Sequence, residues 1–196
     1  MKKLLFINGC IRRAGVSRTW DLCNRYLEKY RKLYPEVLIE ELRLSECGLY
    51  SYLEEDIIRR NELLAEGKRG DEMFSMARQF AVADEILVGV PYWDMSFPSV
   101  LKVYIEHVCV EGITFQTTQD GLKGLAKFTD MVYLSTAGGY VQGRNCGAEY
   151  MKAIAEFLGH GSYRSFVAEG LDIAGNNVEQ ILSDADVELE SLVKIK

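Results

Sequence analysis

Residues 3–7 (KLLFI), followed directly by Asn8 and Gly9, are the stretch of sequence that decides the fold of this chain. An apolar run this short, ended by a glycine, is typical of a β-strand that is buried on both faces. Strands of that kind occur in parallel sheets whose two faces are covered by helices. The stretch therefore predicts an α/β protein.

The rest of the chain alternates in the same manner between strand and helix patterns. Further strands are expected at 37–44, 85–90, 130–135 and 163–168, and helices at 17–33, 54–65, 71–83, 99–110, 146–158 and 178–193. We expect one domain over residues 1–196, a doubly wound five-stranded parallel sheet of flavodoxin-like order 2-1-3-4-5 with helices on both faces. A Rossmann strand order is the alternative, because periodicity alone does not separate the two.

Composition and charge narrow the possible partners. The net charge of −6 argues against nucleic acid and anionic membranes as partners, since both require a basic surface. No apolar run approaches the roughly 20 residues that span a bilayer, and no secretory signal pattern is present, so we expect a cytoplasmic protein. Five widely spaced cysteines without a C-x-x-C pattern predict free thiols, and two distant histidines predict no metal site.

Ligands of open α/β sheets bind beyond the carboxyl ends of the strands, where the strand order reverses. The first loop, residues 9–19, holds two glycines, three arginines and two hydroxyl residues. Ser17, Arg18 and Thr19 open the first helix, whose N–H groups and dipole suit a phosphate, and Arg12 could add charge-assisted hydrogen bonds. The spacing matches neither G-x-G-x-x-G nor a Walker A motif. The alternative is a solvated loop with an ordinary serine cap.

Two further loops complete the predicted site. The aromatic loop, residues 91–98 (PYWDMSFP), is stiff and apolar, so a planar heterocycle could lie against it. The glycine loop, residues 136–140 (TAGGY), permits a close approach of the backbone to a ligand. Either loop alone could be a plain turn that covers the end of the sheet. Their convergence with the first loop predicts a site for a mononucleotide with a flat ring system.

Several motifs in these loops are similar to those of a known family. They resemble the flavodoxin-like NAD(P)H-dependent reductases, and most closely the FMN-dependent NADH-azoreductases of bacteria. The resemblance covers nearly the whole chain. The segments that carry it are Pro91-Tyr92-Trp93, Phe97–Lys102, Ile105-Glu106, Gly112–Phe115, Asp120-Gly121, Gly124-Leu125, Thr136–Gly139 and Ala168–Gly170.

The resemblance implies an FMN-dependent oxidoreductase that passes two electrons from NADH or NADPH, through flavin N5, to a quinone, azo or similar small aromatic acceptor. It implies a ping-pong cycle in a homodimer with the flavin near the interface, and no catalytic side chain. The FMN-binding residues expected on this basis are Cys10, Arg12, Ser17, Arg18, Thr19, Pro91, Tyr92, Trp93, Asp94, Met95, Thr136, Ala137, Gly138 and Gly139.

Three residues depart from the pattern of that family. Cys10 stands in place of a serine, Asp94 in place of an asparagine, and Ala137 in place of an arginine. These departures leave open a flavodoxin-like scaffold that has lost its flavin. A flavodoxin-type electron carrier is the other alternative, although its phosphate loop is usually shorter and lacks arginine. The sequence does not choose between NADH and NADPH or name the acceptor.

Overall fold

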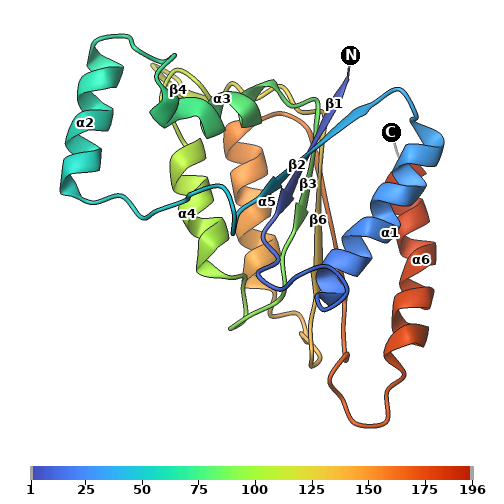
Figure 1. Cartoon of the computed structure of the whole chain (residues 1–196). Helices are drawn as coiled ribbons and strands as arrows, with labels where there is room; N and C mark the ends of the chain where they lie inside the picture. Colours follow the sequence, from blue (N-terminus) through green and yellow to red (C-terminus); the bar gives the residue numbers. More distant parts are fainter. Residues whose placement is uncertain (1, 195–196) are drawn as a thin grey trace.

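The first strand, β1, lies inside a five-stranded parallel sheet of order β2-β1-β3-β6-β7 (Figure 1). The computed structural model describes residues 2–194. The sheet strands are β1 (Lys3–Asn8), β2 (Leu38–Arg43), β3 (Glu85–Gly89), β6 (Asp130–Thr136) and β7 (Ser162–Ala168). The helices are α1 (Arg18–Leu33), α2 (Glu54–Ala65), η1 (Glu72–Phe74), α3 (Ser75–Val82), α4 (Ser99–Val108), α5 (Cys146–Leu158) and α6 (Val178–Lys194). The predicted flavodoxin-like order and the parallel sheet are confirmed.

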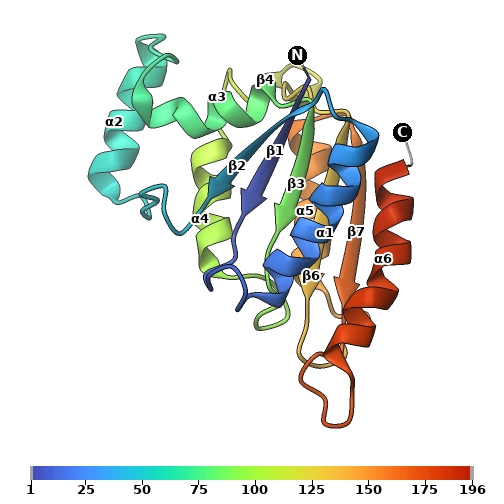
Figure 2. The ribbon, with the colours of Figure 1, turned by 45° about the vertical axis from the view of Figure 1, so that its right-hand side comes forward.

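Both faces of the sheet are covered, which explains the continuous apolar run of β1. Leu5 and Ile7 pack in a cluster with α3, α4 and α5, whereas Leu4 and Phe6 pack with α1 and α6 on the other face. This division follows from the period of two in a strand, where successive side chains point to opposite faces. Figure 2 shows α1 and α6 on one side of the sheet and α4 and α5 behind it.

The strand order reverses between β1 and β3, because the chain passes from β1 to β2 on one side and later returns to β3 on the other. These two strands end together: Asn8 of β1 pairs in register with Gly89 of β3. The N–H of Gly9 then donates to the Gly89 carbonyl oxygen at 2.9 Å. The first loop and the aromatic loop therefore leave adjacent strands at the same edge of the sheet, the position where such folds bind ligands.

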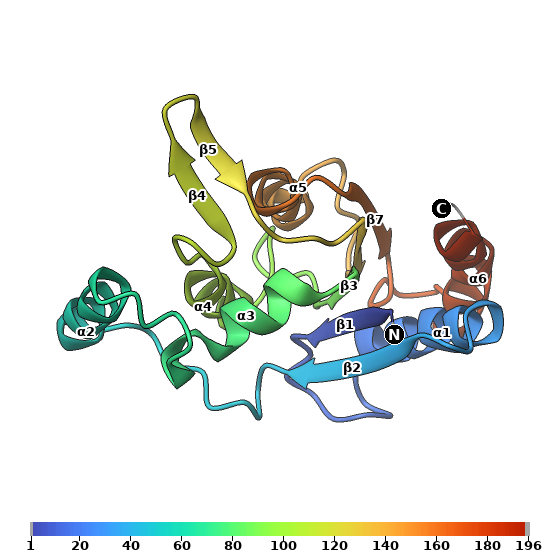
Figure 3. The same cartoon turned by 90° about the horizontal axis from the view of Figure 1, so that it is seen from above.

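Two features of the fold differ from the sequence-based expectation. A two-stranded antiparallel hairpin, β4 (Phe115–Thr118) and β5 (Gly121–Gly124), lies where no strand was predicted, and Figure 3 shows it projecting beside α5. Its turn carries an Asp120-Gly121 pair, with Gly121 at φ 115°. The helical segment expected at 71–83 instead begins as the 3₁₀ turn η1, since the Asp71 side chain accepts from the N–H of Met73.

Helix α2 stands apart from the two clusters that enclose the sheet, at the outer edge of the molecule in Figure 1. Of its residues, Leu63 is buried, and it packs against Phe74 and Val110 rather than against a strand. Ile57 and Ile58 remain exposed on the same helix. Within residues 2–194, no helix combines the length and the apolar character needed to cross a membrane.

Candidate functional site

A cavity of about 280 Å³ opens at the carboxyl edge of the sheet, at the predicted reversal of strand order. It lies among the first loop, the aromatic loop, the glycine loop and the segment that follows β7. Its walls are formed by Ile11, Arg12, Val16, Ser17, Arg18, Thr19, Pro91, Tyr92, Trp93, Thr136, Ala137, Gly138, Leu171 and Asp172. Its volume is close to the lower end of the range, roughly 300 Å³ upward, that small-molecule sites occupy.

One wall of the cavity is the N-terminus of α1. Ser17 caps the helix: its backbone is extended and its Oγ accepts from the N–H of Trp20 at 3.2 Å. Arg18 and Thr19 are the first residues of the helix, so no carbonyl within the helix accepts from their N–H groups. Together with the positive end of the helix dipole, these N–H groups form a site for an anion.

A buried pair of hydroxyl groups joins this wall to the sheet. Thr19 Oγ1 and Thr136 Oγ1 are hydrogen bonded at 2.6 Å, and both residues are buried. The hydrogen bond fixes the start of α1 against the end of β6. The threonine hydroxyl predicted to bind a phosphate thus also holds two walls of the cavity together.

The opposite wall is aromatic and is held in place by backbone contacts. The N–H of Tyr92 donates to the Thr136 carbonyl oxygen at 2.9 Å. The Tyr92 hydroxyl donates to the Arg144 carbonyl oxygen, also at 2.9 Å. Trp93 lines the cavity and is 44% exposed, so one part of its ring remains free for contact. The two aromatic side chains therefore offer a partly open stacking surface.

A tight turn follows this wall. Trp93 and Ser96 exchange two backbone hydrogen bonds, at 3.1 and 2.8 Å, around Asp94 and Met95. Both central residues have positive φ, 50° and 67°, as in the type I′ turns that usually carry Asn-Gly. The Met95 carbonyl oxygen accepts from the N–H of Cys146 at 3.0 Å, which ties the turn to the start of α5.

The floor of the cavity joins the glycine loop to the β7–α6 loop, residues 169–177. The N–H of Ala137 donates to the Ala168 carbonyl oxygen at 2.8 Å, and the N–H of Asp172 donates to the Gly138 carbonyl oxygen at 2.8 Å. A Cβ at the position of Gly138 would lie 2.2 Å from Asp172 Oδ2, so a side chain there would displace this exposed carboxylate. Because Gly138 has no side chain, the Asp172 carboxylate lies directly against the backbone of the glycine loop.

The profile of the family described as having a flavodoxin-like fold matches residues 2–193. This chain belongs to the flavodoxin-like family.

Several proteins are similar to this chain over nearly its whole length. The FMN-dependent NADH:quinone oxidoreductase 2 of Clostridium acetobutylicum is 37% identical over 187 residues, which is 93% of each chain. The FMN-dependent NADH:quinone oxidoreductase of Lachnoclostridium phytofermentans is 33% identical over 181 residues, 91% of each chain. The crystal structure of an azoreductase from Bacillus anthracis is similar at a TM-score of 0.85 and 25% identity, covering 98% of this chain and 99% of its own.

The structure brings most of the residues predicted from sequence to one cavity of the flavodoxin-like fold. Ten of them line it: Arg12, Ser17, Arg18, Thr19, Pro91, Tyr92, Trp93, Thr136, Ala137 and Gly138. Four others, Cys10, Asp94, Met95 and Gly139, do not line it. The cavity also contains residues that were not predicted, namely Ile11, Val16, Leu171 and Asp172. The last two follow β7, the strand beside β6, and that adjacency was the signal available in the sequence.

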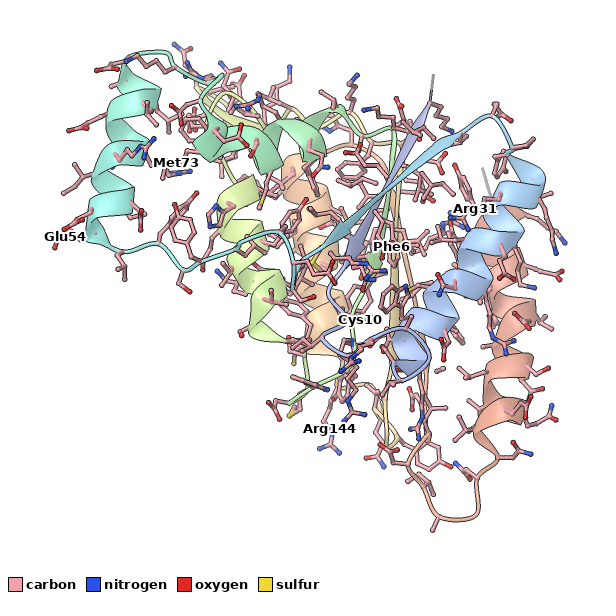
Figure 4. All side chains as sticks on the ribbon, in the orientation of Figure 1. Phe6, Cys10, Arg31, Glu54, Met73 and Arg144 are labelled. Carbon is pink, nitrogen blue, oxygen red and sulfur yellow. The ribbon has the colours of Figure 1, made fainter. Side chains whose placement is uncertain are left out.

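Cys10 is the second residue of the first loop, just beyond the end of β1 (Figure 4). Its N–H donates to Asn8 Oδ1 at 3.0 Å, and its thiol contacts the Gly89 carbonyl oxygen at 3.7 Å. Burial raises the pKa of the Cys10 thiol to about 11, so the group is a neutral thiol near pH 7. The side chain packs against the base of the loop, outside the cavity.

None of the three departures from the family pattern fills the cavity. Cys10 does not line the cavity, and Asp94 is exposed on the turn that follows Trp93. Ala137 is buried and adds only a methyl group to the wall. The cavity therefore keeps the N-terminus of α1, an aromatic surface and bare backbone among its walls.

Proposed function

We propose that this flavodoxin-like protein is an FMN-dependent oxidoreductase that takes electrons from NADH or NADPH and reduces a quinone, an azo compound or a similar small aromatic acceptor. The observation that carries the proposal is the cavity in which the N-terminus of α1 faces the aromatic pair Tyr92 and Trp93. The names of the relatives, FMN-dependent NADH:quinone oxidoreductases, support the cofactor, the electron donor and the class of acceptor.

The residues of the cavity fit FMN. The N–H groups of Arg18 and Thr19, with the Arg12 guanidinium, would hold the phosphate at the start of α1. Tyr92 and Trp93 would lie against the flavin ring, since aromatic faces stack on planar rings. Pro91, Ser17 and the Thr136–Gly139 backbone would make the remaining predicted contacts. Cys10 would support the first loop, and Asp94 and Met95 would lie at the rim of the cavity. We propose that residues 1–196 form this one FMN-binding domain.

Bound FMN would supply the redox chemistry, by accepting a hydride at N5 and giving up two electrons to the acceptor. The side chains of this protein would then position the ring and exclude water from one of its faces. Trp93 and Met95 are 44% and 48% exposed, so they would form an apolar rim on which an aromatic acceptor could rest. No catalytic side chain is proposed.

We further propose a cytoplasmic homodimer. Ile58 on α2 and Leu53 just before it are 52% and 71% exposed, which leaves an apolar surface that a second copy would cover. All five cysteines are free, as expected in a reducing compartment. Light scattering with chromatography tests the assembly: a mass near twice 22.2 kDa is expected, and a monomer at micromolar concentration would contradict it.

The proposed reaction is tested by steady-state kinetics with a benzoquinone and an azo dye. Protein stripped of flavin should oxidise NADH or NADPH only after FMN is restored, and initial rates at varied donor and acceptor should give the parallel lines of a ping-pong cycle. Equal turnover without added FMN, or none at saturating FMN, would contradict the proposal.

A further inference from the structure

A carboxylate of the protein pairs with the side chain of the first residue of α1, beside the proposed anion site. Asp172 Oδ1 accepts from Arg18 Nη1 at 2.6 Å, and both residues line the cavity. Arg18 is also the first residue of the helix whose free N–H groups face the same space. The Arg18 guanidinium is thus already paired with the Asp172 carboxylate.

The position of Asp172 is set by the backbone rather than by the ion pair alone. The N–H groups of Leu171 and Asp172 donate to the carbonyl oxygens of Ala137 and Gly138, at 3.1 and 2.8 Å. The second carboxylate oxygen lies over Gly138, in the space that any side chain at that position would fill. The side chain itself is 70% exposed, so it can turn away from the cavity without unfolding the loop.

A phosphate at the start of α1 and the Asp172 carboxylate would compete for the same guanidinium, and they would also repel each other. We propose that Asp172 is a specificity-determining residue that holds Arg18 in the flavin-free protein and yields it to the phosphate when FMN binds. This inference rests on the proposed function, because it requires the cavity to bind FMN. It adds that Asp172 limits how much the phosphate contributes to flavin affinity.

Flavin fluorescence titrations with FMN and with riboflavin, which lacks the phosphate, test this role directly. Asp172→Asn should lower the Kd for FMN by about three- to tenfold, the range for losing one exposed competing charge, and leave the Kd for riboflavin unchanged. Arg18→Gln should raise the Kd for FMN only. In the Arg18→Gln background, Asp172→Asn should lower the Kd for FMN by less than about twofold, because the competition needs the guanidinium and only weak repulsion through solvent remains.

A matched control is available on the surface between α1 and α6. Asp186→Asn removes the same charge away from the cavity, where the half-buried Asp186 pairs with Arg25 at 2.8 Å and with Lys29 at 3.4 Å. It should change neither Kd. A gain in FMN affinity from Asp172→Asn that is undiminished without Arg18 would overturn the proposal, since it would report general charge rather than competition for the guanidinium. Equal weakening of FMN and riboflavin would also overturn it, because Asp172 would then contact the flavin beyond its phosphate. Binding of neither flavin by the unmodified protein would instead sink the proposed function itself.

Discussion

At the scale of single residues, the most consequential polar contacts outside the cavity lie at the amino ends of the strands. Asp130 at the start of β6 is buried, accepts from Ser162 Oγ at 2.6 Å, and forms an ion pair with Arg164 of β7. At the start of β3, the buried Glu85 accepts from the hydroxyl of Tyr30 at 2.8 Å and pairs with Lys2. These pairs allow charged residues to begin strands that are otherwise apolar.

Replacing Asp130 by Asn should destabilise the fold, because the largely buried Arg164 guanidinium would lose its counter-charge. The expected loss in the free energy of unfolding is about 3 kcal/mol, measured by urea denaturation. Asp186→Asn, which disrupts the half-buried pairs with Arg25 and Lys29, should cost less, about 1 kcal/mol. Similar losses of unfolding free energy in the two variants would contradict this prediction, because burial of the Asp130–Arg164 pair would then add nothing to its contribution.

The cysteines give a prediction that depends on pH. Alkylation requires the thiolate, and burial raises the pKa of Cys10 to about 11, so this residue is almost fully protonated at pH 8. Iodoacetamide at pH 8 should therefore modify the exposed Cys146 first and leave Cys10 unmodified, as read by peptide mass spectrometry. Protection of Cys10 should weaken only as the pH rises toward its raised pKa. Rapid labelling of Cys10 at pH 8 would mean that the first loop opens in solution.

The residues of the first loop show what sequence could and could not predict at this scale. A serine cap at Ser17 was the alternative to the predicted phosphate contact, and the structure shows this cap, with Ser17 Oγ accepting from the N–H of Trp20. The direction of Cys10 was not predictable, because it depends on how the chain bends past Gly9. Gly9 lies so close to β3 that a Cβ there would be 2.4 Å from Val90 Cγ1, a contact visible only in the folded protein.

At the scale of elements, variants of two helix caps distinguish an effect on stability from an effect on FMN binding. Ser17 caps α1 at the cavity, and Asn145 caps α5, its Oδ1 accepting from the N–H of Ala148 at 2.9 Å. Ser17→Ala and Asn145→Ala should each lower the free energy of unfolding by about 1 kcal/mol. Only Ser17→Ala should also weaken FMN binding, since its helix terminus faces the proposed phosphate. Equal effects of the two variants on the Kd for FMN would contradict the assignment of α1 as the phosphate site.

Long amphipathic patterns predicted the helices well, and short local signals did not. The observed bounds of α2 and α5 are the predicted ones, because each has a clear apolar pattern with a defined start. The β4–β5 hairpin was missed although Asp120-Gly121 is a typical turn pair, since its strands carry only four residues each. That α2 would pack away from the sheet was also not predictable, because its apolar residues do not reveal what covers them.

At the scale of the whole molecule, the site follows from topology. Parallel strands place their carboxyl ends at one edge, so loops that are far apart in sequence converge there. That rule predicted the three loops around the cavity from the order of strands alone. Applied to the last strand as well, the same rule indicates the β7–α6 loop, but the place of Asp172 in the cavity also depends on hydrogen bonds between that loop and the glycine loop.

The central claim is tested most directly by an absorbance spectrum of the purified protein, taken after incubation with FMN and desalting, and again after anaerobic addition of NADH or NADPH. A retained flavin band that either nucleotide bleaches is expected. A retained band that neither nucleotide bleaches would contradict the reductase function and favour an electron carrier. A protein that retains no flavin after saturating FMN would contradict the proposed cofactor itself.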